Sequence, residues 1–202
     1  MESMKEICSR IELQKEVREI ILAMEENREL FQREEEIRKL TEAEHWRKAR
    51  ADLKEAMGAD PRGLKILYCM IKAAVISWEK YQEQGIEGKI FDDTMKCFTR
   101  FVEEHKASYG VYGFDRDFWT GRQLSLQLFR LGELEYEKVE EENGERYISI
   151  HIPSDAVLDP EKIKESLFSA KAFFEKKDPS WDNIPYKCGS WLLSPALKEL
   201  LG

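Results

Sequence analysis

A change of hydrophobic periodicity between residues 128 and 137 constrains the fold of this chain more than any other feature. Before this segment, apolar residues recur every three or four positions, which is typical of helices, whereas two later runs alternate as half-buried strands do. The pattern predicts a helix from Asp117 to Arg130, a switch at Gly132 and a first strand from Leu131 to Val139. The sequence therefore predicts an α+β fold, in which a helical N-terminal half is joined to an α+β half.

The segment before residue 131 has the spacing of five or six helices. We expect the main ones to cover residues 5–24, 42–57, 64–81, 91–106 and 117–130. Residues 25–39 are so highly charged that we expect a solvated helix or a connector there. Thr41 to Glu44 resembles a capping box, and Asp60-Pro61 is typical of a helix start.

The segment after the switch alternates strand and helix patterns. Asn143-Gly144 predicts a tight turn between two antiparallel strands, the second of them from Arg146 to Ile152. Beyond Pro153 the chain shows a helix start at Asp159-Pro160, a helix to Lys176, a strand from Tyr186 to Leu193 and a helix start at Pro195. The expected order is therefore β-β-α-β-α.

Composition narrows the function classes. The 202 residues carry a formal net charge of −8, which argues against broad binding to nucleic acid or to an anionic membrane surface, because both need an excess of Lys and Arg. The four cysteines are dispersed and form no C-x-x-C pair, so we expect free thiols, with neither a zinc site nor a disulfide framework. No stretch is apolar enough for a signal peptide or a membrane span, which favours a cytoplasmic, soluble protein.

Five motifs share an order and spacing with a known family. They are Phe91-Asp92-Asp93-Thr94, Leu128 to Glu137, His151-Ile152-Pro153, Glu165-Ser166-Leu167 with Ala170 and Phe173-Phe174, and Cys188 to Leu193. In these motifs the chain resembles bacterial acyltransferase-domain proteins, which join a helical N-acyltransferase N-terminal domain to a GNAT-like C-terminal domain. The resemblance implies a helical domain over residues 1–130 and a GNAT-like domain over residues 131–202. It implies that this second domain is a small GNAT-like mixed sheet with packed helices. That second domain is expected to be either cut short at Gly202 or reduced.

The resemblance also implies a co-substrate and a reaction. In GNAT-type folds acyl-CoA, such as acetyl-CoA, lies between two splayed parallel strands and donates its acyl group to an amine. Here those strands would be Arg146 to Ile152 and Tyr186 to Leu193, and no metal is implied. The residues expected to border the donor are Ile152, Ser154, Asp155, Ser190 and Trp191. A small-molecule amine or a peptide amine is the expected acceptor.

The loop after the second strand departs from ordinary GNAT enzymes. It lacks their glycine-rich signature and carries Asp155, Asp159 and Glu161, whose charges would repel a pyrophosphate, while Pro160 lacks an N–H donor. These features favour a second hypothesis, a non-catalytic GNAT-like module that binds a ligand or a protein. A basic side chain over the loop would instead favour the acyltransferase.

Candidate catalytic residues lie on the two hairpin strands. His151 has the chemistry of a general base for an attacking amine, although a histidine at a strand end can equally bond to the backbone. Glu135 and Glu137 offer carboxylates on one face and Tyr136 a phenol on the other, yet alternating surface residues explain this pattern nearly as well. Arg130 is expected to bind a phosphate or carboxylate, or to pair with Asp115, Asp117 or Glu133.

Overall fold

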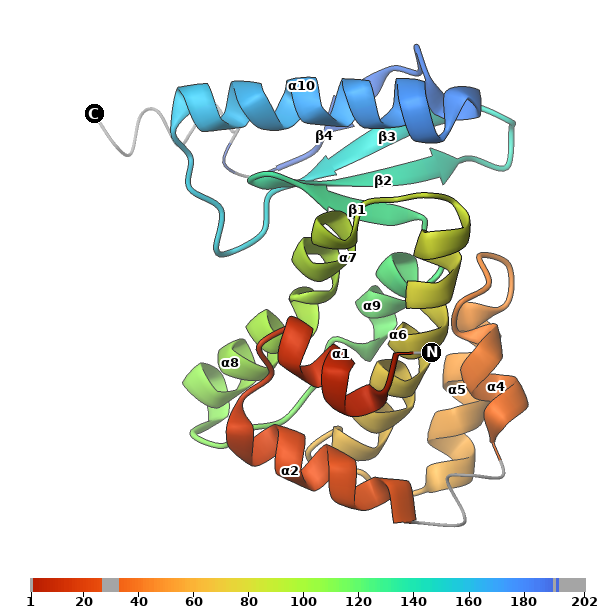
Figure 1. Ribbon diagram of the computed structural model, residues 1–202, viewed down its shortest axis with the longest axis vertical. Helices are drawn as coiled ribbons and strands as arrows, with labels where there is room; N and C mark the ends of the chain where they lie inside the picture. Colours follow the sequence, from red (N-terminus) through yellow and green to blue (C-terminus); the bar gives the residue numbers. More distant parts are fainter. Residues whose placement is uncertain (1, 27–32, 191, 193–202) are drawn as a thin grey trace. The chain divides into compact units, whose positions relative to one another are not determined.

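The computed structural model describes residues 2–26, 33–190 and 192, which form two compact units, residues 1–127 and 128–202 (Figure 1). The first unit is helical in the part that the structure describes. Its helices are α1 (Met4–Arg10), α2 (Lys15–Ala23), α4 (Glu34–Lys39), α5 (Trp46–Met57), α6 (Leu64–Glu83), α7 (Gly88–Met95), α8 (Cys97–Tyr109) and α9 (Asp117–Leu124), with a 3-10 turn η1 (Met24–Glu26).

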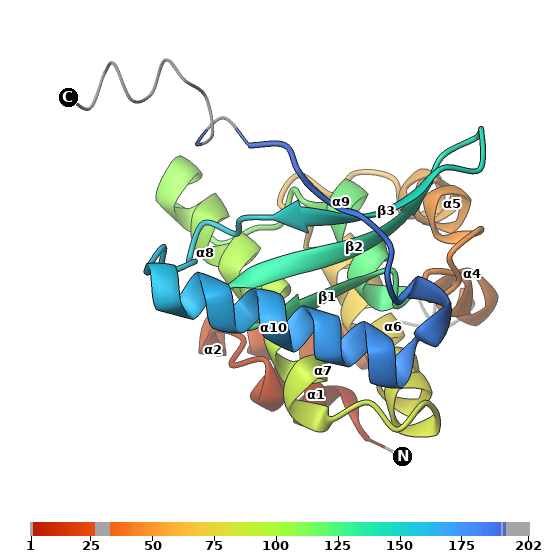
Figure 2. The ribbon, with the colours of Figure 1, turned by 90° about the horizontal axis from the view of Figure 1, so that it is seen from above.

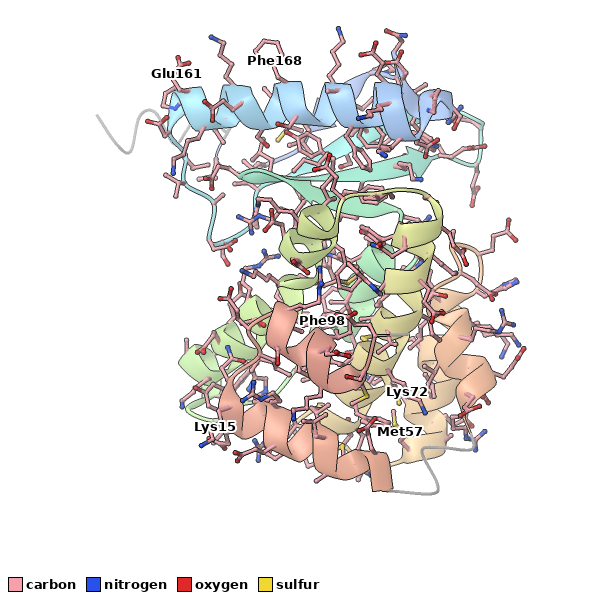
Figure 3. The ribbon with its side chains drawn as sticks, in the orientation of Figure 1. Lys15, Met57, Lys72, Phe98, Glu161 and Phe168 are labelled. Atoms are coloured by element: carbon pink, nitrogen blue, oxygen red, sulfur yellow. The ribbon has the colours of Figure 1, made fainter. Side chains whose placement is uncertain are left out.

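Helix α6 is the centre of this unit. It contacts α1, α2, α4, α5, α7 and α9, and its side chains from Leu64 to Ala74 are largely buried. Phe91 of α7 packs on its Trp78 and Tyr81 rings, with centroids 5.0 and 5.2 Å apart. Phe98 of α8, labelled in Figure 3, is fully buried in the same unit. The helix begins at Leu64, after the expected start at Pro61. Asp60 nevertheless satisfies one of its first donors, because its carboxylate accepts a hydrogen bond from the Ile66 N–H at 3.0 Å.

The expected helix over residues 5–24 is wrong in one respect, because it is broken in two. Glu12, between α1 and α2, has a positive φ of 57°. Ile11 and Leu13 are both buried, although residues two apart cannot share one face of a continuous helix. The break therefore lets both side chains enter the core.

Two other helices differ from the prediction. The helix over 91–106 is divided between α7 and α8, which meet at Lys96. Residues 42–45 precede α5 as a turn, so Thr41 caps nothing there. Its hydroxyl instead donates to the Arg38 carbonyl at 2.8 Å and accepts from Lys80 at 2.7 Å. Of the charged segment 25–39, residues 34–39 form α4 and residues 27–32 lie outside the described chain.

The switch from helix to strand comes earlier than Gly132. Helix α9 ends at Leu124, Leu126 has a φ of 57°, and β1 (Leu128–Leu131) follows. Gly132, with a φ of 75°, belongs to the tight turn between β1 and β2 (Leu134–Glu140). The predicted strand from Leu131 to Val139 therefore covers β2 as far as Val139, the turn and the last residue of β1, while residues 128–130, predicted as helix, form the rest of β1.

The second unit is a four-stranded mixed sheet in the order β1-β2-β3-β4, with α10 (Pro160–Lys177) along one face (Figure 2). β3 (Arg146–His151) runs antiparallel to β2 and parallel to β4 (Tyr186–Cys188), and a 3-10 turn η2 (Pro179–Trp181) precedes β4. The α+β class, the turn at Asn143-Gly144 and the helix start at Asp159-Pro160 are confirmed. The strand expected to reach Leu193 ends at Cys188. Trp191, Leu193 and the helix start at Pro195 lie outside the described residues.

Ser166 of α10 links the helix to the β1–β2 hairpin by hydrogen bonds. Its buried hydroxyl donates to the Leu131 carbonyl and accepts from the Leu134 N–H at 3.2 Å. Since that proton is used, the Tyr136 hydroxyl donates to the same oxygen at 2.9 Å. Beside these bonds, Phe129 packs on Phe173 with ring centroids 4.7 Å apart. The hairpin and helix therefore share one polar anchor within an aromatic core.

We expect Ser166→Ala to lower the free energy of unfolding by about 2 kcal/mol, because it leaves the Leu134 N–H and the Tyr136 hydroxyl buried without their acceptor. Urea unfolding of the full chain, followed by amide hydrogen exchange in β1 and β2, measures the change. Ser169→Ala, an exposed serine of the same helix, is the matched control for helix propensity. Equal stability of the two variants would contradict the anchor.

Candidate active site

His151 and Glu137 form a hydrogen-bonded pair on the sheet face opposite α10. Glu137 lies on β2 and pairs in register with Ser149, while His151 is the last residue of β3. The Nε2 atom of His151 is 2.8 Å from Oε2 of Glu137, and the two side chains are 26% and 14% exposed. The pair is therefore partly shielded from solvent while the imidazole keeps an accessible edge.

The carboxylate decides which imidazole nitrogen carries the proton. An ionised carboxylate only accepts hydrogen bonds, so Nε2 of His151 donates to Glu137. In the neutral ring the lone pair is then on Nδ1, which is the atom able to take a proton. The Glu137 charge also stabilises the imidazolium that would form. This is the arrangement of a general base with an orienting carboxylate.

Glu135 lies between two basic residues in the ladder. It pairs in register with Arg130 of β1 on one side and with His151 of β3 on the other, so the three side chains form a row on one sheet face. Glu135 is only 2% exposed. The sheet thus concentrates two carboxylates, Glu135 and Glu137, around one imidazole.

Tyr136 lies on the other face of β2. Its hydroxyl is engaged by Ser166 of α10, and burial raises the pKa of the phenol to about 12. The phenol therefore stays protonated at neutral pH, and its proton is directed toward α10. This placement favours a structural role and separates Tyr136 from His151 and the two glutamates.

The parallel ladder between β3 and β4 ends where the sequence places the donor residues. The last pair is Ile150 with Cys188. Extending this register by two residues would place Ile152 opposite Ser190, beyond the end of both strands. The two candidates thus come from the two strands at the same end of the ladder, and Trp191 lies outside the described residues.

The loop from Pro153 to Asp159 is less repulsive than its sequence indicates. Arg130 donates from one terminal nitrogen to both oxygens of Asp155, at 2.7 and 2.9 Å, and is only 12% exposed. Asp155 is thus a partner of Arg130 that was not among the carboxylates expected for it. Ser154 precedes this ion pair in the same loop, on the exposed side. A basic side chain does lie over the loop, which is the feature that favours an anionic ligand.

Sequence reasoning missed the partner of Val157. Glu133, in the β1–β2 turn, accepts a hydrogen bond from the Val157 N–H at 2.8 Å, and Lys162 is 3.6 Å from its other oxygen. Glu133 and Val157 are 24 positions apart. The prediction placed Glu133 inside one strand from Leu131 to Val139, so it showed neither the turn nor this contact.

Three other features of the described residues bear on the function classes. No cluster of three His, Cys, Asp or Glu side chains within residues 2–26, 33–190 and 192 is arranged to hold a metal ion. No helix in these ranges is long and apolar enough to cross a membrane. Burial raises the pKa of the Cys188 thiol, which disfavours a thiolate nucleophile there.

Two domain families match the sequence. The N-acyltransferase N-terminal domain matches residues 2–126, and the GNAT-like C-terminal domain matches residues 128–202. No curated protein matches the chain.

Solved structures of acyltransferases share the fold. One, in complex with decanoyl-CoA and teicoplanin, is 24% identical with a TM-score of 0.79, over 96% of this chain and 63% of that protein. Another, in complex with CoA and 10C-teicoplanin, is 22% identical with a TM-score of 0.80, over 100% of this chain and 65% of that protein. The chain thus spans slightly under two thirds of the length of these proteins.

We expect proton NMR of the wild-type chain to show a resolved Nε2–H resonance for His151, because the Glu137 carboxylate slows its exchange with water. Glu137→Ala removes the acceptor and should abolish the resonance. Glu141→Ala, which removes an exposed carboxylate from the same hairpin, should leave it in place. Persistence of the resonance in Glu137→Ala would show that the pair does not form in solution.

Proposed function

The chain belongs to the family that joins an N-acyltransferase N-terminal domain to a GNAT-like C-terminal domain, and from this premise we propose that it transfers an acyl group from acyl-CoA to an amine. One observation carries the proposal. The parallel β3–β4 ladder stops at Ile150 and Cys188, and the His151–Glu137 pair lies at that same end of β3. A donor between the strand ends would therefore have a base next to it.

The reaction follows from the polarity of the groups. His151 Nδ1 takes a proton from the ammonium form of the acceptor, so the free amine attacks the thioester carbonyl. A nitrogen–carbon bond forms and the carbon–sulfur bond breaks. The attacking nitrogen then gives up its second proton, and the CoA thiolate takes that proton to leave as the thiol. Glu137 holds the imidazole in orientation and stabilises its charge. Tyr136 takes a structural part, because its hydroxyl is committed to Ser166.

The donor is proposed to lie against residues of both strands and of the loop after β3. They are Ile152, Ser154, Asp155, Ser190 and Trp191. Arg130 supports this proposal, because its guanidinium offsets the charge of Asp155. The solved acyltransferases that share the fold hold CoA or decanoyl-CoA, which adds support for an acyl-CoA donor.

The acceptor is proposed to be a small-molecule amine or the amine of a peptide. The row containing Glu135 and the neighbouring Glu137 gives this sheet face carboxylates, which favour a cationic ammonium group over an alcohol. Two of the similar solved structures contain teicoplanin or 10C-teicoplanin, and teicoplanin is a glycopeptide, so peptides belong in the first acceptor panel.

A non-catalytic module that binds a ligand or a protein is the second candidate function. The observation that favours it is that N–H donors near this loop are already hydrogen-bonded to carboxylates of the same chain. Glu133 binds the Val157 N–H, and Asp159 accepts from the N–H groups of Glu161 and Lys162 at 3.1 and 3.2 Å. A phosphate would find these donors already bonded.

Calorimetric titration of the full chain with CoA, acetyl-CoA and decanoyl-CoA tests the donor, and release of free thiol with a panel of amines tests the reaction. We expect micromolar binding that weakens with salt, since phosphate groups contribute to it. His151→Ala should reduce turnover at least about 100-fold, the usual contribution of a general base, with little change in donor affinity.

His45→Ala is the matched control, because His45 is an exposed histidine at the start of α5 and lies in the other unit. Its turnover should equal that of the wild type. Absence of heat and of thermal stabilisation with all three donors, in protein shown to be folded, would overturn the acyltransferase proposal. Donor binding without turnover in any amine would favour the binding module.

A further inference from the structure

The carboxylate of Glu133, in the β1–β2 turn, is bound to groups in the segment before α10 and at the start of that helix. Glu133 Oε2 accepts from the Val157 N–H at 2.8 Å, and Glu133 Oε1 is 3.6 Å from the Lys162 ammonium. The Glu133 side chain is 20% exposed. A backbone donor and an ammonium group at a helix start are the groups that bind a phosphate oxygen, and here they already hold a negative charge.

Several other donors of this segment are already hydrogen-bonded within the chain. Asp159 caps α10 by accepting from the Glu161 and Lys162 N–H groups, and Pro160 has none. The Ala156 N–H donates to the Pro153 carbonyl at 3.0 Å. Release of Asp159 would uncap the helix, whereas Glu133 comes from a turn 24 residues away and makes a loose ion pair with Lys162. Glu133 is therefore the group that can be displaced at least cost.

The charge balance points in the same direction. Four carboxylates, those of Glu133, Asp155, Asp159 and Glu161, surround this segment, against the three cations Arg130, Lys162 and Lys164. Arg130 is held by both oxygens of Asp155 and also donates from Nε to the Gly132 carbonyl at 3.1 Å. If Glu133 moves away, Lys162 can bind another anion, and the Val157 N–H loses its negatively charged acceptor.

We propose that Glu133 is an internal competitor for the phosphate groups of the acyl-CoA donor, so that donor binding displaces it from Val157 and Lys162. This inference rests on the proposed function, because it concerns the donor of that reaction. It assigns to Glu133 the role of setting donor affinity, with no contact to the reacting atoms. It also accounts for an acidic segment at a place where a phosphate is to bind.

The first test is the affinity of the full chain for CoA, by calorimetry, in wild type and Glu133→Gln. The amide keeps the size of the side chain and an acceptor for Val157 but removes the charge, so CoA should bind about tenfold more tightly, the order expected for one charge near a partly exposed anion. Glu161→Gln is the matched control. It removes the same charge from the first turn of α10, where Glu161 points outward (Figure 3), and should change affinity less than about twofold at physiological salt.

Pantetheine, which lacks the phosphates, separates competition from a general opening of the site. Its affinity should be the same in wild type and in Glu133→Gln. A second measurement needs no variant: in wild-type protein the Val157 amide resonance should shift on saturation with CoA and stay in place with pantetheine.

Each result decides between the two proposals. If wild type and Glu133→Gln bind CoA equally and the Val157 resonance is unmoved, Glu133 is no competitor, whereas the acyltransferase proposal stands. An equal gain in Glu161→Gln would assign the effect to long-range charge and overturn the competitor. If no variant binds CoA, both proposals fail together.

Discussion

The tight turn at Asn143-Gly144 fixes the register of β2 against β3, and the arrangement of the candidate site depends on that register. Gly144 has a φ of 82°, a conformation that glycine adopts without strain, and Glu141 and Glu145 are bonded across the turn. The register places Glu135 opposite His151 and Tyr136 opposite Ile150. A slip of one residue would exchange the two faces of β2, taking the glutamates toward α10 and the tyrosine to the face of His151.

Because one face is fixed by packing, the other is free to carry charge. On the α10 side, Ser166 bonds three groups of the hairpin and the Phe129, Phe173 and Phe174 rings pack together. These contacts hold the strands in place without using any group of the opposite face. Arg130, Glu135, Glu137 and His151 can therefore lie in one region of the sheet even though several charges there are poorly exposed. Their mutual pairing offsets part of the cost of their burial.

Local signals in the sequence were sufficient for some elements and insufficient for others. The turn at Asn143-Gly144 and the helix start at Asp159-Pro160 each depend on a few adjacent residues, and both were predicted correctly. At Asp60-Pro61 the same dipeptide precedes a helix that begins only at Leu64. The β1–β2 turn was missed because Leu131 to Val139 alternates without interruption through a two-residue turn, so periodicity alone cannot show it. Breaks such as the one at Glu12 depend on what the neighbouring helices bury, which no local pattern contains. On the face that carries the candidate site, the residues could be predicted, since His151 and the two glutamates were candidates. The ion pair between Arg130 and Asp155 could not, because the two residues are 25 positions apart and only the folded structure brings them together.

That link changes how the acidity of the β3–α10 loop should be read. From the sequence alone, the charges of Asp155, Asp159 and Glu161 are expected to repel a phosphate from the loop. In the folded chain Asp155 is neutralised by Arg130 and Asp159 is used as a helix cap. The carboxylate that meets the Val157 N–H comes from Glu133, outside the loop. The electrostatic field at such a site is set by which carboxylates stay paired when a ligand arrives, because a paired charge repels an anion far less than a free one. On the proposal made for Glu133, the affinity of this loop for a phosphate is set by one glutamate of the β1–β2 turn more than by the composition of the loop itself.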